Sequence, residues 1–181
     1  MDVLTDLLER SRARGAAFAR TTARGAWGLA FPTSPGLAVH VVVDGELSLW
    51  TTADPDAGVR LRGGELALVR GDVDHRIGHR AGATCRDLDE ALAEGADPTV
   101  ARRVVVGEAD APPAAEFFCG AYLFEGDLCD GLLQLLPDTL VVRPAVGSPL
   151  RSLLDLMGVE LLRDEPGQQA LLDRLLDVAL I

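Results

Sequence analysis

The residues best suited to chemistry are two histidines and a cysteine, His40, His75 and Cys119. The run from His75 alternates, so that His75, Ile77 and His79 share one face of a strand while arginines take the other. Because arginine is seldom buried without a partner, we expect His75 to point inward. Imidazole and thiolate suit Zn²⁺ and other transition metals. If His40 also points inward, the three side chains predict a metal site with one open position.

A ligand pocket without a metal is the alternative for the same residues. His79 cannot replace His40 in a metal site, because it lies ~13 Å along the strand from His75 at ~3.3 Å per residue. Two buried histidines would then supply polar contacts within apolar walls, as in the mouths of β-barrels. The candidate ligand-binding residues are Trp27, Leu29, Phe31, His40, His75, Cys119 and Tyr122. Each could instead simply fill the core.

Patterns typical of other chemistry do not occur in the sequence. We find no paired carboxylates for acid–base catalysis, no Ser-His-Asp order and no glycine-rich phosphate loop; Gly63-Gly64 is a strand entry. We therefore expect no catalytic residue, and a binding protein rather than an enzyme.

The strand pattern indicates a mainly β protein that would position these side chains. Eight or nine short segments separated by Gly, Asp and Pro are typical of a sandwich or closed barrel. They are Arg24–Pro32, Gly36–Val43, Glu46–Thr52, Val59–Arg62, Glu65–Arg70, His75–Arg80, Ala101–Val106, Glu116–Glu125 and Thr139–Arg143. Asp44-Gly45 between two of these segments predicts a β-hairpin, because both turn positions need positive φ.

Helical spacing occurs near both ends of the chain. Asp2–Arg14 predicts an amphipathic helix, and Arg86–Glu94 one or two helical turns. Ser148-Pro149 predicts the start of a helix that forms a hairpin with a second helix at Gln168–Ile181. The hairpin carries more apolar positions than one packed face needs, so we expect it to form a homodimer. The expected dimerisation residues are Leu150, Leu153, Leu154, Met157, Leu161, Leu172, Leu175 and Leu176. Alternatively, Leu153 or Met157 only packs onto the barrel.

The last residues of the chain stay apolar and in helical period, without a residue that would end the helix. Val178–Ile181 contains no Gly, Asn or basic residue, and a free carboxylate there would sit at the negative end of the helix dipole. We therefore expect the helix to continue in a longer parent protein.

Three segments in order resemble the cupin domain at the N-terminus of AraC-type transcription regulators. Gly36–Leu49 is similar to that family's H-x-V-x-x-G-E strand and turn, and Gly64–His75 resembles the second conserved cupin motif. Cys119-Gly120 followed by Leu132–Pro137 is similar to the family's C-G…L-L-x-x-L-P segment. The resemblance covers nearly the whole chain.

The resemblance implies a cupin-like jelly-roll β-barrel at residues 1–145, with an N-terminal helix, that senses a small-molecule effector. It implies a helical dimerisation hairpin at 146–181, and a DNA-binding module of two helix-turn-helix units expected after residue 181. Arg70 and Asp72 replace the Pro and second Gly of the second motif, and Ala38 stands where the first metal-binding histidine of cupin enzymes would fall. The sequence therefore assigns no cofactor, and zinc or another transition metal is the alternative at His40, His75 and Cys119.

Two other functions remain open at this point. One is a stand-alone, metal-dependent cupin enzyme such as a dioxygenase or isomerase, against which the incomplete first motif argues. The other is a redox sensor that uses Cys119 and Cys129. Three cysteines, an odd number without a C-x-x-C pair, argue against a disulfide framework or a zinc ribbon.

The charge of the chain bears on its partners. All 17 basic residues are arginine, against 28 acidic residues, for a net charge of −11. No apolar stretch approaches the ~20 residues that span a bilayer, and no secretory signal precedes the first strand. We expect a cytoplasmic protein without membrane contact that reaches DNA only through another module.

We predict that the purified chain does not bind duplex DNA at moderate salt, because binding relies on basic side chains neutralising phosphates. A gel-shift assay with this chain alone checks the prediction. Sequence-specific retardation would contradict it.

Overall fold

The computed structural model describes residues 14–96, 103–123, 133–163 and 165–180. The strands are β1 (Arg14–Arg24), β2 (Gly28–Phe31), β3 (Leu37–Thr51), β4 (Val59–Arg62), β5 (Leu66–Arg70), β6 (His75–Gly78), β7 (Arg86–Asp87), β8 (Arg103–Gly107), β9 (Pro113–Leu123) and β10 (Thr139–Val142). The helices are α2 (Leu88–Gly95), α4 (Pro149–Glu160) and α5 (Gln168–Leu180). The helix predicted at Asp2–Arg14 lies outside the described residues except for Arg14, which begins β1.

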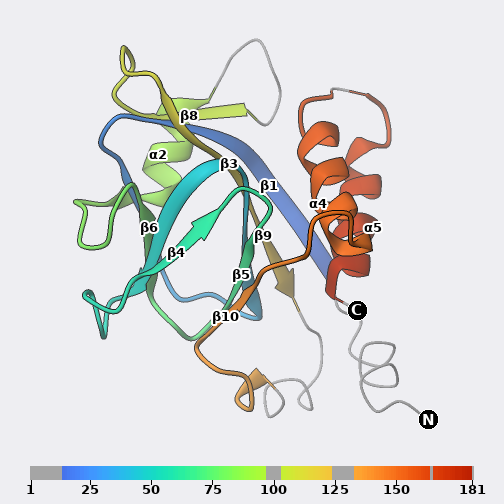
Figure 1. Ribbon diagram of the computed structural model, residues 1–181, viewed down its shortest axis with the longest axis horizontal. Coiled ribbons are helices and arrows are strands. Elements are labelled where there is room, and N and C mark those ends of the chain that lie inside the picture. Colours follow the sequence, from blue (N-terminus) through green and yellow to red (C-terminus); the bar gives the residue numbers. More distant parts are fainter. Residues whose placement is uncertain (1–13, 97–102, 124–132, 164, 181) are drawn as a thin grey trace.

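The strands form one curled, mixed sheet, and α4 and α5 lie together along one side of it (Figure 1). The mainly β architecture with a C-terminal pair of helices is confirmed. β3 pairs with β5 and β9 along its first half and with β4 and β6 along its second half. β1 pairs with β9 antiparallel and with β8 parallel. The curl therefore encloses one apolar core and leaves a second one between the sheet and the two helices.

The prediction of a β-hairpin at Asp44-Gly45 is wrong. Residues 37–51 form a single strand, in which the register to β9 shifts between Val42 and Asp44. Gly45 has a φ of +73°, and a Cβ there would lie 2.2 Å from the carbonyl oxygen of Ala114. A β-bulge of this kind bends a strand without ending it. The Asp-Gly pair thus lets β3 pass from one part of the curled sheet to the other.

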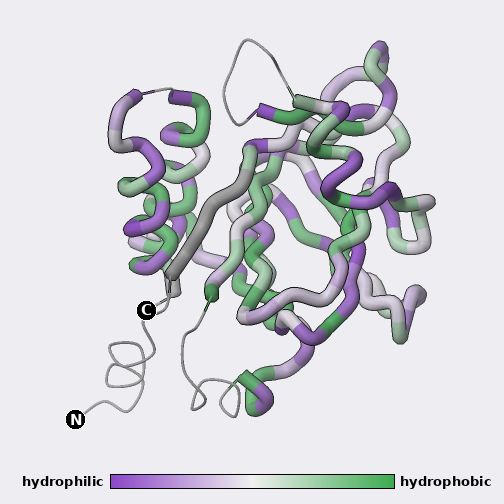
Figure 2. Tube along the Cα trace, turned by 180° about the vertical axis from the view of Figure 1, so that it is seen from behind, coloured by the Kyte–Doolittle hydropathy of each residue, from purple (hydrophilic) through white to green (hydrophobic). Residues whose placement is uncertain are grey.

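The helical hairpin was predicted correctly in its position and its start. The Ser148 side chain accepts a hydrogen bond from the Arg151 N–H, and Pro149 occupies the first helical position. Hydrophobic and hydrophilic residues alternate along both α4 and α5 (Figure 2), as expected for helices that bury one face. Among the described residues, no helix has the length and apolar character needed to cross a membrane.

The buried face of the hairpin packs on the sheet of the same chain, which corrects the predicted dimer surface. Five predicted dimerisation residues are at most 3% exposed: Leu154, Met157, Leu161, Leu172 and Leu176. They contact the outward face of the sheet at Leu37, Val39, Val41, Leu66, Phe118 and Tyr122. Leu150 and Leu175 are half-buried against the same cluster, and Leu153 is half-buried. The exposed apolar side chains of the hairpin are instead Leu156, Val159, Leu162, Leu171 and Val178.

Candidate functional site

The structure brings His40, His75 and Cys119 together inside the curled sheet. His40 on β3 is directly opposite Cys119 on β9 in the strand register. His40 Nδ1 lies 3.0 Å from Cys119 Sγ, and His40 Nε2 lies 2.8 Å from His75 Nε2. All three side chains are buried, with 0% of His40 exposed. His40 and His75 therefore both point inward, as the strand alternation predicted for His75.

One set of protonation states satisfies every hydrogen bond in this cluster. His75 Nδ1 lies 3.1 Å from the Val73 carbonyl oxygen, which can only accept, so this nitrogen carries the proton. In a neutral ring, His75 Nε2 then accepts from His40 Nε2–H. His40 Nδ1 is left to accept from the Cys119 thiol. The result is a directed chain of neutral groups that runs from Cys119 through both histidines to the Val73 backbone.

Burial keeps each member of the chain uncharged. Desolvation lowers the pKa of His40 well below 6.5, and the neighbouring His75 lowers it further. Desolvation also lowers the pKa of His75, although the Val73 carbonyl and Asp74 partly oppose the shift. The pKa of the Cys119 thiol is raised by burial, so the thiol stays protonated. A protonated thiol is a weak nucleophile and a poor metal ligand.

The lowered histidine pKa values predict loss of stability in mild acid. Both histidines bind protons more readily in the unfolded chain, whose histidine pKa is near 6.5, than in the folded one. Well above pH 6.5 the two histidines therefore do not make the free energy of unfolding depend on pH. As the pH drops through that value the free energy of unfolding falls, by up to about 1.4 kcal/mol per pH unit for each histidine.

Urea unfolding at pH 7.5, 6.5 and 5.5 checks this expectation. Replacing the exposed His79 with glutamine should leave the slope between pH 6.5 and 5.5 unchanged. A slope that disappears in the His79 variant, or that is absent in the parent chain, would contradict it.

The side chains as placed do not fit the predicted three-ligand metal site. His40 turns one ring nitrogen to Cys119 and the other to His75, so the three groups do not face a common point. The 2.8 Å between the two Nε2 atoms is also shorter than the roughly 3.3 Å expected for two nitrogens ~2.0–2.1 Å from one tetrahedral ion. Within the described residues, no three His, Cys, Asp or Glu side chains are grouped to hold a metal ion.

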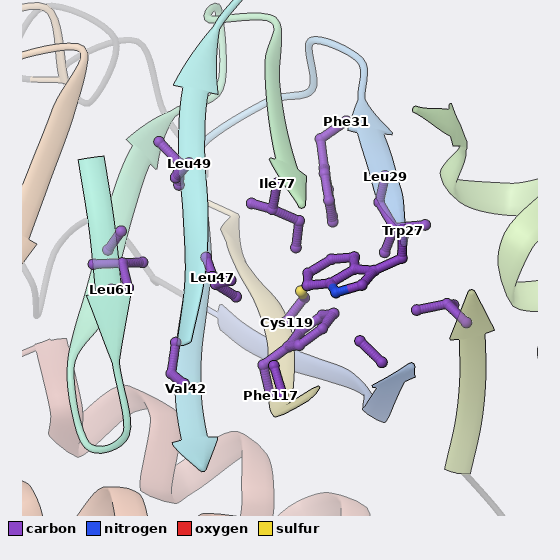
Figure 3. Packing of buried hydrophobic residues seen from close by; sticks show 14 of the residues in the cluster. Trp27, Leu29, Phe31, Val42, Leu47, Leu49, Leu61, Ile77, Phe117 and Cys119 are labelled. Carbon is purple, nitrogen blue, oxygen red and sulfur yellow. The ribbon is translucent and has the colours of Figure 1, made fainter. Parts of the chain in front are cut away.

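Among the aromatic residues predicted as pocket walls, Phe31 packs against both histidines. The Phe31 ring stacks on His75 with 5.1 Å between centroids and meets His40 edge-on at 4.7 Å. Trp27 stacks on Phe117 at 5.2 Å. Figure 3 shows Trp27, Phe117 and Cys119 gathered in the same core. A cavity of about 10 Å³ beside Leu29 and Cys119 remains, which is about the space of one water molecule.

Two of the predicted residues lie elsewhere. Tyr122 belongs to the outward face of β9, and its hydroxyl donates to the Leu176 carbonyl oxygen of α5. It is therefore no part of the interior cluster. An offset of three residues from Cys119 places it on the opposite face of a strand, a signal that the sequence already contained. Cys129, named for the redox alternative, lies outside the described residues.

A larger cleft opens between β2, α2 and β8. This cleft of about 490 Å³ has Trp27 and Leu29 among its walls. Charged residues line it as well: Arg86 of β7, Glu94 of α2 and Glu108 after β8. Sequence reasoning missed these three, because they come from separate elements and form no motif. Trp27 and Leu29 are therefore predicted ligand-binding residues that line a space of ligand size.

Comparisons with known proteins give a family and several solved structures. The family described as "Cupin" matches residues 2–181. The apo form of a ToxT variant from Vibrio cholerae strain SCE256 is similar with a TM-score of 0.45 and 6% identity, over 92% of this chain and 52% of that chain. ToxT from Vibrio cholerae O395 gives 0.43 and 6%, over 92% and 52%. The unsaturated fatty acid bound wild-type ToxT of strain SCE256 gives 0.43 and 7%, over 92% and 50%.

The chain spans about half the length of these solved structures. None of the curated proteins matches it.

Proposed function

The chain belongs to the cupin family, and we propose that it is the effector-sensing and dimerisation domain of an AraC-type transcription regulator. In this proposal residues 1–145 bind a small molecule, and residues 146–181 carry the response to a DNA-binding module of the full-length regulator. The motif resemblance in the sequence supports the regulator class.

One observation carries the proposal. β3 and β9 form a wall that has the cluster of His40, His75 and Cys119 on its inner face and the helical hairpin on its outer face. Alternation along β9 turns Phe117 and Cys119 inward and Phe118 and Tyr122 toward the helices. β3 does the same, since His40 faces the interior while Val39 and Val41 lie in the hairpin core. A shift of either strand on ligand binding therefore moves the surface on which α4 and α5 rest.

Polar contacts also join the hairpin to parts of the sheet beside this wall. Arg20 of β1 forms an ion pair with Glu116 of β9 and donates to the Gly158 carbonyl oxygen of α4. The Arg151 guanidinium donates to the Gly63 carbonyl oxygen at 3.2 Å. The same guanidinium lies directly over Gly64, where a Cβ would come within 1.7 Å of Arg151 Nη1. The hairpin thus rests on backbone groups whose positions change when the sheet moves.

The alternatives receive less support from the cluster. A metal-dependent enzyme needs ligands that converge, whereas His40 faces its two partners with different nitrogens. A redox sensor needs a thiolate, whereas burial raises the pKa of Cys119.

For homodimerisation we propose the exposed apolar side chains of the hairpin in place of the buried ones. A 44% exposed Leu171 and a 58% exposed Val178 are available for it on α5.

A fusion protein tests the proposed function. Compounds that raise the Tm of the purified chain are selected first. The chain is then joined after Ile181 to the two-unit helix-turn-helix module of an AraC-type regulator, in cells carrying a reporter under that module's promoter. We expect the selected compounds to change reporter expression. Compounds that raise the Tm but never alter the reporter would contradict the proposal.

Tyr122→Phe, in the same fusion, tests whether the contact between the sheet and the hairpin transmits the response. It removes the hydroxyl that donates to Leu176 and keeps the buried ring. We expect the compound-induced Tm shift to persist while the reporter response becomes smaller.

A further inference from the structure

α2 lies at a seam between the two end strands of the curled sheet. The main run of paired strands begins at β7 and ends at β8, and within the described part of the chain these two strands do not pair with each other. α2 follows β7 directly, and Ala96 after it forms a bridge with Val104 of β8. α2 contacts β2, β7 and β8, and it lies beside β8 in Figure 1. The helix therefore covers the seam.

α2 and Leu29 of β2 line two spaces, one on each side of them. The cleft of about 490 Å³ outside has Leu29, Ala91 and Glu94 in its lining. The cavity of about 10 Å³ inside is lined by Leu29 and by Leu88 and Leu92 of α2. Its remaining walls come from β1 and β9, at Ala19, Thr21, Phe117 and Cys119. Because β1, β2 and β9 are all paired with other strands, α2 is the wall of this cavity that sheet pairing does not hold.

Weak interactions hold α2 in place. Of its eight residues Ala91 is the buried one, while Leu88 and Leu92 are half-buried against the core. An ion pair of 2.7 Å joins Arg86 to Glu94, but the two side chains are 52% and 68% exposed, and exposed pairs contribute little stability. A short helix with so little buried surface opens more readily than the strands around it.

We propose that α2 is a gate, which opens outward at the seam and admits a small, uncharged molecule to the interior beside Cys119. Among the described residues, the lining of the cavity has no charged side chain, and its polar groups are the Thr21 hydroxyl and the Cys119 thiol. The open gate joins the cleft to the inner face of the wall formed by β3 and β9. The inference rests on the proposed sensing function, for which it names the route and the chemical class of the effector.

Chemical modification of Cys119 measures the opening. The chain used is Cys85→Ser/Cys129→Ser, in which Cys119 is the remaining one of three cysteines. The probe is methyl methanethiosulfonate, a small uncharged reagent that transfers its methylthio group to a thiolate and releases methanesulfinate. Cys119 is 6% exposed and burial raises its pKa, so the closed protein should not react. The mass gain of the intact chain therefore reports openings that admit the probe.

We expect Cys119 to react without urea, at a rate that stays nearly constant as urea is raised below the unfolding transition. A local opening exposes little surface, whereas a reaction through global unfolding accelerates steeply with urea.

Two helix caps provide a matched pair of variants. The Asp87 side chain caps α2 by accepting from the Asp89 N–H at 2.9 Å, so Asp87→Ala should react roughly fivefold faster. Ser148→Ala removes the corresponding cap from α4 in the hairpin, and it should leave the rate without urea unchanged.

An anionic reagent tests the chemical class. The 2-sulfonatoethyl analogue of the probe carries the same reactive group, and each rate is divided by the rate of the same reagent with the urea-unfolded chain. We expect the anionic reagent to be at least about tenfold slower on this scale, because its charge must leave water to reach Cys119.

Several outcomes would overturn the inference. The gate is wrong if Cys119 stays unmodified until the chain unfolds, or if Asp87→Ala and Ser148→Ala accelerate the reaction equally. The chemical class is wrong if both reagents give equal normalised rates. Failure of the proposed function has a different signature: Cys119 reacts as expected, but no compound that raises the Tm changes the reporter of the fusion protein.

Discussion

Replacing Leu172 with glutamate should unfold the chain. Leu172 of α5 is 0% exposed and packs in the core between the hairpin and the sheet. Removing a buried leucine side chain alone costs about 2–5 kcal/mol. A carboxylate without a partner in the same place adds a further cost, against a total stability of about 5–15 kcal/mol for a typical domain. Circular dichroism and urea unfolding measure the loss.

Leu171→Glu is the matched control, because it makes the same change one residue away on the same helix. Leu171 is 44% exposed, so its variant should stay within about 0.5 kcal/mol of the parent chain. If Leu171 lies in the proposed dimer interface, its variant should also run as a folded monomer in size-exclusion chromatography with light scattering. A folded monomer obtained from Leu172→Glu would instead show that the buried face is the interface.

Replacing His40 with alanine should destabilise the chain by roughly 3–6 kcal/mol. The substitution leaves a cavity and removes the common partner of Cys119 and His75. Each buried polar group left without a hydrogen bond costs about 1–3 kcal/mol, and the cavity adds to that sum. The thiol and the imidazole have no access to solvent as compensation, because both are buried. Chemical denaturation measures the difference.

The matched control is His79→Ala, which truncates an exposed histidine. His79 Nδ1 contacts the backbone of Trp27, so we expect a loss of about 1 kcal/mol. If His40→Ala and His79→Ala cost the same, the hydrogen-bonded chain in the core contributes nothing to stability.

Local signals in the sequence predicted the elements that local chemistry determines. Ser148 and Pro149 start α4 because a serine oxygen can pair with a free helical N–H and proline lacks one. The inward direction of His75 followed from the arginines that alternate with it. These inferences need only neighbouring residues.

Elements that depend on distant partners were missed. Asp44-Gly45 has the chemistry of a tight turn, yet β3 continues through it because other strands pair with it on both sides. β1 is rich in alanine and arginine, which have modest strand preference, and its pairing with β8 and β9 determines its conformation. Strand pairing between distant segments cannot be predicted from local composition.

The candidate site divides in the same way. Strand alternation predicted the inward direction of His75, whereas the meeting of His40, His75 and Cys119 was predicted only on the condition that His40 also points inward. The roles of the two His40 nitrogens depend on ring orientation, which has no signature in the sequence. The cleft residues Arg86, Glu94 and Glu108 come together only in the folded chain. On the hairpin, apolar residues occur on several faces, so only the structure distinguishes Leu172 from Leu171.

Hydrogen–deuterium exchange of the purified chain, with and without a compound that raises its Tm, tests the sensing role most directly. If the wall of β3 and β9 couples the interior around His40 and Cys119 to the hairpin, saturating compound should slow exchange in both strands and also in α4 and α5. Protection confined to the cleft around β2, α2 and β8, with exchange in α4 and α5 unchanged at saturation, would contradict it.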